Sequence, residues 1–122
     1  MNSTAYEKGF RNLIVWKEAH ALTLFVYKLS SLFPKSEQFG ITSQMRRASS
    51  SIAAQLAEGS RMPTMSHRKL YYDRSYASAA ELDSFFDLVK DLQYIEENDY
   101  RLGIEKINKV SFLLKRLITA TQ

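Results

Sequence analysis

The sequence predicts an all-α protein, an antiparallel up-down-up-down four-helix bundle in a single domain that spans residues 1–122. Turn-forming residues are scarce, with 4 glycines and 2 prolines, so the elements must be few and long. Apolar residues recur at the helical spacing of three and four in four successive segments. No segment keeps the apolar–polar alternation of a strand, and no Asn-Gly or Asp-Gly hairpin turn occurs.

The first helix is expected at roughly 10–33, after an N-terminal tail at 1–9 that we expect to be flexible. Its apolar stripe consists of Val15, Ala19, Leu22, Val26, Leu29 and Phe33. Pro34 is expected to stop the helix, because the residue before a proline avoids the helical conformation.

The second helix is expected at roughly 43–58, with Thr42 or Ser43 as its N-cap and Gly59 as a left-handed C-cap. Its apolar side consists of Met45, Ser49, Ile52 and Leu56. Small residues fill its other faces, among them three consecutive serines, which are poor helix formers. We therefore expect neighbouring helices to approach this helix closely on more than one side.

The third helix is expected at roughly 66–95, with Ser66 as its N-cap, and the fourth at roughly 99–120. The third is expected to bury Tyr71, Ser78, Leu82, Phe85, Val89 and Leu92, a stripe widened by Leu70, Ala77, Leu88 and Ile95. The fourth is expected to bury Tyr100, Gly103, Ile107, Val110, Leu114 and Leu117. Short connections between successive helices make them antiparallel neighbours.

Composition narrows the class of protein. Apolar residues make up 45% of the chain and charged residues 25%, which is typical of a globular protein. Without cysteine, disulfides and thiolate chemistry are excluded. The N-terminus lacks the apolar core of a signal peptide, and no apolar run is long enough to span a membrane. We expect a cytoplasmic protein, and its net charge of +4 leans mildly toward an anionic partner.

No enzymatic site is expected. His20 and His67 are the only histidines, and neither belongs to the Glu-x-x-His motif of metal-binding bundles. The four glycines stand alone, so there is no phosphate-binding loop. We therefore predict no catalytic residue, no metal ligand and no cofactor.

A second aromatic face on the first helix indicates self-association. A monomeric bundle needs one apolar stripe per helix, yet large side chains also lie off that stripe. With small residues of the second helix, the expected subunit interface comprises Trp16, His20, Leu24, Tyr27, Ser50 and Ala54. The alternative is that the aromatic residues merely flank a wide core stripe.

The charges of the second helix oppose its dipole, because Arg46 and Arg47 lie in its first turns and Glu58 in its last. Ion pairs with the antiparallel third helix would offset this unfavourable interaction with the dipole. We expect Glu58 to pair with Arg74 or Arg61, and Arg46 or Arg47 to pair with Glu81. Such an interior or interface network fixes helix register more than it stabilises the fold.

Several short motifs are recognisable together. In order they are VWKEA (15–19), FP (33–34), FG (39–40), SQMRRAS (43–49), SI (51–52), AEGSR (57–61) and ASAAEL (77–82). The chain resembles the four-helix-bundle family encoded in intervening sequences of bacterial 23S ribosomal RNA genes, also labelled the S23 ribosomal protein family. The accessory variability protein of diversity-generating retroelements is a relative of that family.

The resemblance implies a homopentamer without enzymatic activity. For the retroelement relatives it also implies nucleic-acid binding and association with a reverse transcriptase. This chain departs from the family pattern at Ala53, where the family has proline, and at Gln55, where it has asparagine. Arg74 places a charge where the family has an aliphatic residue.

Two basic clusters are candidates for contacting RNA or DNA. The fourth helix carries Arg101, Lys109, Phe112 and Arg116 on one face, where cations and an aromatic ring could contact phosphates and a base. Arg61, Arg68 and Lys69 form the second cluster, whereas residues 81–97 are acidic. The sequence thus predicts a non-enzymatic, oligomeric nucleic-acid-binding bundle. The alternative is a purely structural or protein–protein interaction module, whose charged faces are merely solvated.

Overall fold

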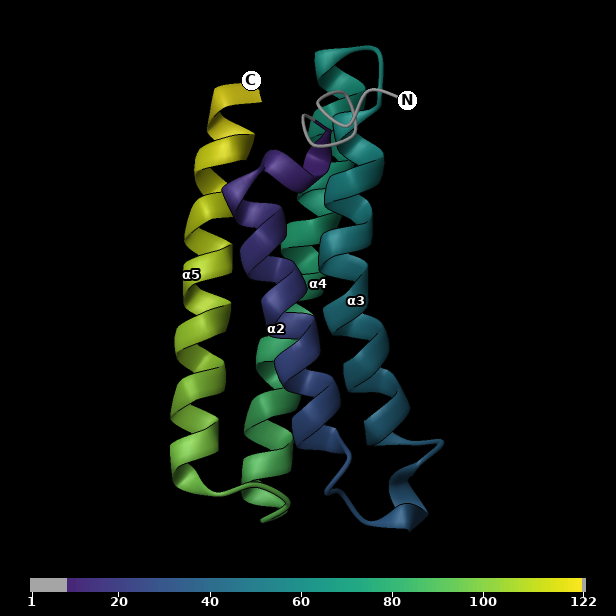
Figure 1. The fold of residues 1–122 in the computed structure, drawn as a ribbon, viewed down its shortest axis with the longest axis vertical. Coiled ribbons are helices and arrows are strands. Elements are labelled where there is room, and N and C mark those ends of the chain that lie inside the picture. Colours follow the sequence, from purple (N-terminus) through teal and green to yellow (C-terminus); the bar gives the residue numbers. More distant parts are fainter. Residues whose placement is uncertain (1–8, 122) are drawn as a thin grey trace.

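The computed structural model describes residues 9–121, which form four long α-helices (Figure 1). The elements are η1 (Phe10–Asn12), α2 (Ile14–Ser30), η2 (Lys35–Glu37), α3 (Ile41–Ser60), α4 (Met65–Asp91) and α5 (Glu97–Thr121), where η denotes a 3-10 helix. The all-α prediction is therefore confirmed. Most of the tail expected at 1–9 lies outside the described residues.

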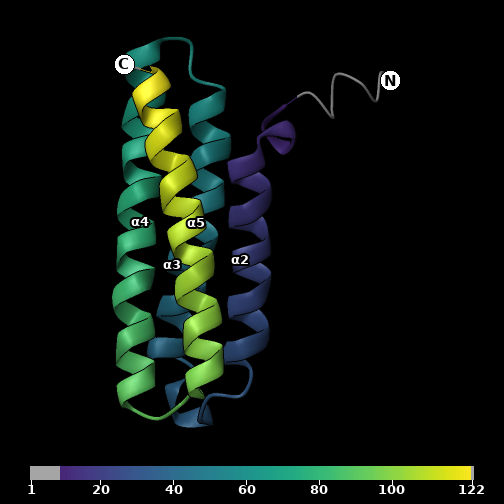
Figure 2. The same ribbon diagram turned by 90° about the vertical axis from the view of Figure 1, so that its left-hand side faces the viewer.

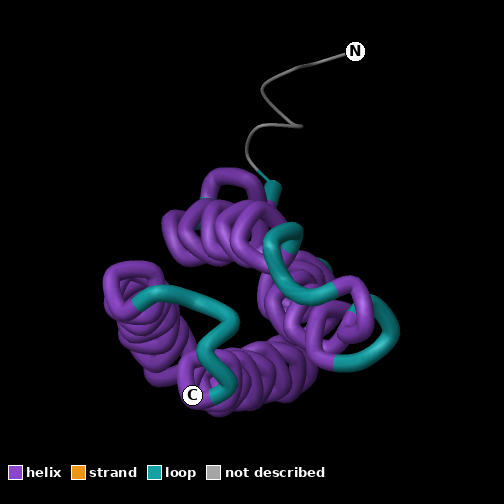
Figure 3. Tube along the Cα trace, turned by 90° about the horizontal axis from the view of Figure 1, so that it is seen from below, coloured by secondary structure: helices purple, strands orange, loops and turns teal. Residues whose placement is uncertain are grey.

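The four helices surround a single core. α2 and α4 each pack against both α3 and α5, so every helix has two neighbours, and successive helices run antiparallel (Figures 2 and 3). One end of the bundle carries η1, the α3–α4 connection and the C-terminal end of α5 (Figure 1). The α2–α3 and α4–α5 connections lie at the opposite end (Figure 1).

Three of the four apolar stripes lie where the sequence predicts them. On α2 and in the turn that follows it, the whole expected stripe is buried. On α3, Met45, Ser49, Ile52 and Leu56 are fully enclosed. On α5 the buried positions include Gly103, Ile107, Val110 and Leu114, and the two ends of the expected stripe are half-buried.

The stripe predicted for α4 is largely wrong. Its buried residues are Tyr72, Ser75, Ala79, Leu82, Phe86 and Val89, so Leu82 and Val89 alone were assigned correctly. Tyr71 and Phe85 are half-buried, and Leu92 is exposed. Ser75 can occupy the core because its hydroxyl donates to the Ile52 carbonyl of α3 at 2.7 Å, which satisfies a buried polar group.

The first two helices begin differently from the prediction. Residues 10–12 form a 3-10 turn and Leu13 is extended, so α2 starts only at Ile14. α3 starts at Ile41, where Gly40 is the N-cap without any side-chain hydrogen bond, and Thr42 is buried inside the helix. Neither Thr42 nor Ser43 therefore caps α3.

Gly59 does not form the left-handed C-cap that the sequence predicts. It lies within α3, and no described glycine has a positive φ. A Cβ atom at this position would lie 2.8 Å from Cε1 of Tyr72, so the glycine lets α3 and α4 approach closely. α3 also continues unbroken through Ala53, which retains the amide hydrogen that a proline would lack.

The ends of α4 are set by other residues than expected. Thr64, and not Ser66, is the N-cap, and its hydroxyl accepts a hydrogen bond from the His67 amide at 3.2 Å. At the other end Gln93 adopts φ 63°, and the Tyr94 amide donates to the Val89 carbonyl at 2.9 Å. This is a Schellman ending, which stops the helix at Asp91 and not at 95.

Candidate nucleic-acid interface

Charge is segregated along the axis of the bundle. The half that contains η1 consists of residues 9–21, 51–78 and 109–121, and it carries nine Lys or Arg against three Asp or Glu, a formal charge of +6. The other half, residues 22–50 and 79–108, carries seven cations against nine anions, a formal charge of −2. We call the first the basic half and the second the acidic half.

Two groups of the acidic half have raised pKa values. In the acidic half, burial and the neighbouring Asp87 carboxylate raise the pKa of Asp83. The Tyr100 hydroxyl donates to Asp87 at 2.5 Å, and this hydrogen bond raises the pKa of Tyr100 to about 12. Asp87 contributes to both shifts, which reflects the concentration of carboxylates in this half.

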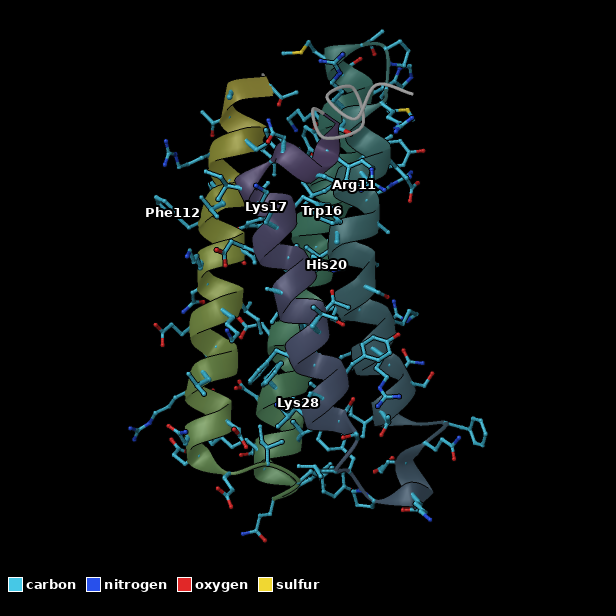
Figure 4. All side chains as sticks on the ribbon, viewed as in Figure 1. Arg11, Trp16, Lys17, His20, Lys28 and Phe112 are labelled. Atoms are coloured by element: carbon cyan, nitrogen blue, oxygen red, sulfur yellow. The ribbon has the colours of Figure 1, made fainter. Side chains whose placement is uncertain are left out.

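The residues of the basic face predicted on α5 do not form one continuous basic surface. Arg101 lies in the acidic half, 3.5 Å from the Glu97 carboxylate, and Lys109 lies 3.1 Å from the Glu18 carboxylate of α2. Phe112 is 62% exposed, with the Arg116 guanidinium 5.8 Å from its ring centroid. Figure 4 shows Phe112 on the side of α5 that faces away from α2. Only Phe112 and Arg116 remain as a coherent candidate there.

The cluster predicted at the α3–α4 connection lies entirely in the basic half. Arg61 is exposed at the end of α3 and forms no ion pair with any described residue. The Arg68 Nε atom donates to the Met62 carbonyl at 2.8 Å. Lys69 forms an ion pair with Asp73 at 2.8 Å, which neutralises its charge locally. Arg61 and Arg68 are therefore the cations of this cluster best placed to meet an anion.

An aromatic stack lies beside these cations. The rings of Trp16 and His20 are 4.9 Å apart and nearly parallel, at 13°, and Phe10 lies 5.2 Å from Trp16. The Arg11 guanidinium lies 4.4 Å from the centroid of the Phe10 ring. Figure 4 shows Trp16, His20 and the exposed Lys17 along α2. We call Phe10, Trp16 and His20 the aromatic stack.

Sequence reasoning missed Arg11, Lys17 and Lys28 as candidate cations. A signal was nevertheless present, because three aromatic residues between positions 10 and 28 are each followed directly by a cation, the first two pairs in the basic half and the third in the acidic half. The pairs are Phe10–Arg11, Trp16–Lys17 and Tyr27–Lys28. A pattern of this kind is compatible with single-stranded nucleic acid, where rings stack on bases and cations meet phosphates.

A pocket of about 350 Å³ opens next to the aromatic stack. Its lining consists of Gly9, Phe10, Leu13, Ser60, Arg61 and Tyr72. Tyr72 is only 5% exposed, and its hydroxyl has no hydrogen-bond partner within residues 9–121. Burial raises the pKa of Tyr72, and the nearby Arg68 charge lowers it in part, so the hydroxyl stays protonated at neutral pH. It can therefore donate to a ligand in this pocket.

The charge network expected around α3 forms only in part. Arg47 pairs with Glu81 at 2.5 Å, but the two side chains are 52% and 39% exposed, so the pair lies at the surface and not in the interior. The expected pair of Arg46 or Arg47 with Glu81 is thus formed by Arg47, and Arg46 has other partners. Its Nε atom donates to the Ser30 hydroxyl at 2.8 Å and its guanidinium lies 4.8 Å from the centroid of the Tyr27 ring.

The expected partner of Glu58 was wrong. Glu58 is exposed, and within residues 9–121 it forms no ion pair with Arg74 or Arg61. The Arg74 guanidinium instead lies 5.2 Å from the centroid of the Tyr71 ring on its own helix. α3 therefore ends with an uncompensated carboxylate beside its C-terminal carbonyl groups, which is an unfavourable placement.

The residues expected at a subunit interface lie on the outer sides of α2 and α3. Leu24 is 59% exposed and Tyr27 44%, whereas Trp16 is partly buried and packs against the core. Tyr27 and Ser50 line the same open depression, of about 540 Å³. Ala54 is exposed one turn further along α3.

The described residues contain no group of three His, Cys, Asp or Glu side chains that could hold a metal ion. None of the helices in residues 9–121 combines the length and the apolar character that crossing a membrane requires.

Comparison with known proteins identifies the family. The model of the family described as 23S rRNA-intervening sequence protein matches residues 11–116. The fold is similar to the crystal structure of a protein of unknown function from the S23 ribosomal protein family of Bacteroides thetaiotaomicron VPI-5482. The TM-score is 0.81 at 17% identity, over 87% of this chain and 96% of that one. No curated protein matches. The chain therefore belongs to the 23S rRNA-intervening sequence protein family.

Proposed function

We propose that this protein is a non-enzymatic, oligomeric, cytoplasmic helical bundle that binds RNA or DNA through its basic half. The observation that carries the proposal is the segregation of charge, with nine cations against three anions in that half. A polyanion is attracted to such a surface because binding releases its condensed counterions. The aromatic stack adds rings that a base can contact.

Oligomerisation is the second part of the proposal. Several large apolar side chains are strongly exposed, among them Leu24 at 59%, Leu32 at 80% and Phe39 at 90%. The resemblance of the sequence to the 23S rRNA-intervening sequence protein family favours a homopentamer. In a ring, each basic half is repeated in every subunit, so that contacts which are weak in one subunit add up by avidity.

A salt series tests the nucleic-acid part. We expect a labelled single-stranded oligonucleotide to bind with an affinity that falls steeply as salt rises. In Arg61→Ala/Arg68→Ala, binding should weaken and the slope of log affinity against log salt concentration should become shallower by about 1.4, which is about 0.7 for each cation on a single strand. The matched control Lys35→Ala/Lys106→Ala removes the same charge from the acidic half and should bind like the wild type. Absence of salt-dependent binding at low ionic strength would exclude this function.

The exposed apolar side chains also favour a different function, that of a purely structural or protein–protein interaction module. In that case the protein would self-associate in sedimentation experiments and bind no oligonucleotide. A reverse transcriptase, the partner that the resemblance implies for retroelement relatives, is the first candidate for a co-purification test.

A further inference from the structure

We propose that the pocket between η1, the end of α3 and α4 holds one unstacked nucleotide of a single strand, with the base against Phe10 and its phosphate on Arg61. The adjoining Trp16–His20 pair would carry the neighbouring base. This inference rests on the proposed function and deepens it, because it names the form of nucleic acid and the site that takes it.

The pocket has both an apolar wall and a polar partner for a base. Phe10 and Leu13 supply the apolar wall, and the Tyr72 hydroxyl supplies a hydrogen bond. In residues 9–121 no fully buried side-chain nitrogen or oxygen lacks a partner, so the unbonded Tyr72 hydroxyl must reach open space. Tyr72 itself is 95% buried, so this hydroxyl is held in place by the core.

Arg61 is the group that would bind phosphate. It is exposed, lines the pocket and forms no ion pair within the described part of the chain. The neighbouring Ser60 hydroxyl already donates to the Ala57 carbonyl at 2.7 Å, so it does not compete as a donor. Arg68, whose Nε atom donates to the carbonyl of Met62, the residue after Arg61, adds a second positive charge at the same connection.

The aromatic stack can be extended by one base. Phe10 has Arg11 over its ring, and Trp16 is flanked by Phe10 and His20. His20 is exposed, so it ends the stack and leaves room for a further ring. The exposed Lys17, on the same part of α2, is placed to meet the phosphate of that next nucleotide (Figure 4). Bases paired in a duplex cannot enter this arrangement, because stacking requires them to be splayed out.

A second copy of the chain is a less suitable occupant of this surface. Trp16 is already partly covered, so it offers a partner little new apolar area. A subunit contact here would also bury the Arg61 and Lys17 charges, which costs free energy unless an anion accompanies them. A nucleic-acid strand brings that anion at each nucleotide.

Trp16 is the only tryptophan, so its fluorescence reports on this site alone. We expect an unlabelled oligothymidylate of about 12 nucleotides to quench it, at a concentration where a duplex of equal length does not. The affinity would be measured in parallel by anisotropy of a labelled strand, which reports binding anywhere on the protein.

Three variants locate the site. Tyr72→Phe keeps the ring but removes the hydroxyl, and should weaken binding several-fold without changing the circular dichroism spectrum. Arg61→Ala should weaken binding by about tenfold. Its matched control is Arg74→Ala, which removes an exposed arginine of the basic half from outside the pocket and should cost much less affinity.

The outcomes separate this inference from the proposed function. Salt-dependent binding without quenching of Trp16, and with equal losses in Arg61→Ala and Arg74→Ala, would place the nucleic acid elsewhere and overturn the inference alone. Absence of binding at low salt overturns both. A change of Trp16 fluorescence on dilution of the protein alone, together with a lower sedimenting mass in Arg61→Ala, would show that the surface is a subunit contact and would also overturn the inference.

Discussion

Gly103 is a residue whose missing side chain sets the distance between two helices. It lies inside α5 and is buried against Phe86 of α4, which is itself fully buried. A Cβ atom at position 103 would come within 2.7 Å of the Cζ atom of Phe86, far closer than van der Waals contact. α5 can therefore lie against the Phe86 ring only because this residue has no side chain.

We predict that Gly103→Ala destabilises the protein. Alanine is the better helix former by about 1 kcal/mol, but crowding a packed core costs about 1–3 kcal/mol, so the net loss should be about 1 kcal/mol. Urea unfolding would measure it. In a Phe86→Leu background the ring is gone, and the same substitution should be less harmful. A Gly103→Ala protein more stable than the wild type would contradict this account of the contact.

At the scale of the element, α4 shows that the apolar pattern of a long helix need not predict which of its residues are buried. Leu70, Leu88 and Leu92 are each 45% exposed, while Ser75 is fully buried. The helix therefore buries a stripe that includes a serine, while leucines at other positions stay exposed. Its ends depend on the hydroxyl of Thr64 and on the left-handed conformation of Gln93.

The N-cap of α4 gives a direct test. Thr64→Ala should lower the free energy of unfolding by about 1 kcal/mol, because the His67 amide loses its acceptor. Ser66→Ala is the control, since Ser66 lies within the first turn and accepts from no backbone amide of the described residues. Chemical denaturation of both variants decides between the two residues. Equal losses would mean that the cap is shared.

These two cases show what sequence can and cannot predict for this fold. On α2, α3 and α5 the buried stripe is the one that periodicity predicts. On α4 the buried stripe includes Ser75, whose hydroxyl is satisfied by a hydrogen bond to α3 that no local pattern contains. Similarly, Gln93 carries no sequence signal for a left-handed conformation, which glycine would have supplied.

The candidate site was only partly predictable for a related reason. Arg61 and Arg68 could be found as part of a basic cluster. The pocket beside them needs residues from η1, α3 and α4 together, and periodicity does not show which helix faces meet. The partner of Arg46 was missed because a serine hydroxyl and a tyrosine ring, and not a carboxylate, receive its charge.

At the scale of the whole molecule, the exposed apolar residues of α2 are expected to mediate self-association. Leu24→Asp should reduce the sedimenting mass, because a carboxylate would have to be buried in the interface. Phe112→Asp is a matched control on α5, since Phe112 is 62% exposed against 59% for Leu24. Analytical ultracentrifugation compares the two. An unchanged mass in Leu24→Asp would remove this part of α2 from the interface.

The serines of α3 have a further consequence for how this surface meets water and other molecules. Ser49, Ser50, Ser51 and Ser60 each donate their hydroxyl hydrogen to a carbonyl three residues earlier in the same helix. Ser49 is fully buried, but the other three are partly exposed, and their hydrogens are engaged before any partner arrives, so that their oxygen lone pairs alone remain for water or a partner. Such a surface remains wettable when free, yet it loses few hydrogen bonds when covered. At these three serines, α3 can thus pass between water and a dry contact without a change in the hydrogen bond that each hydroxyl donates.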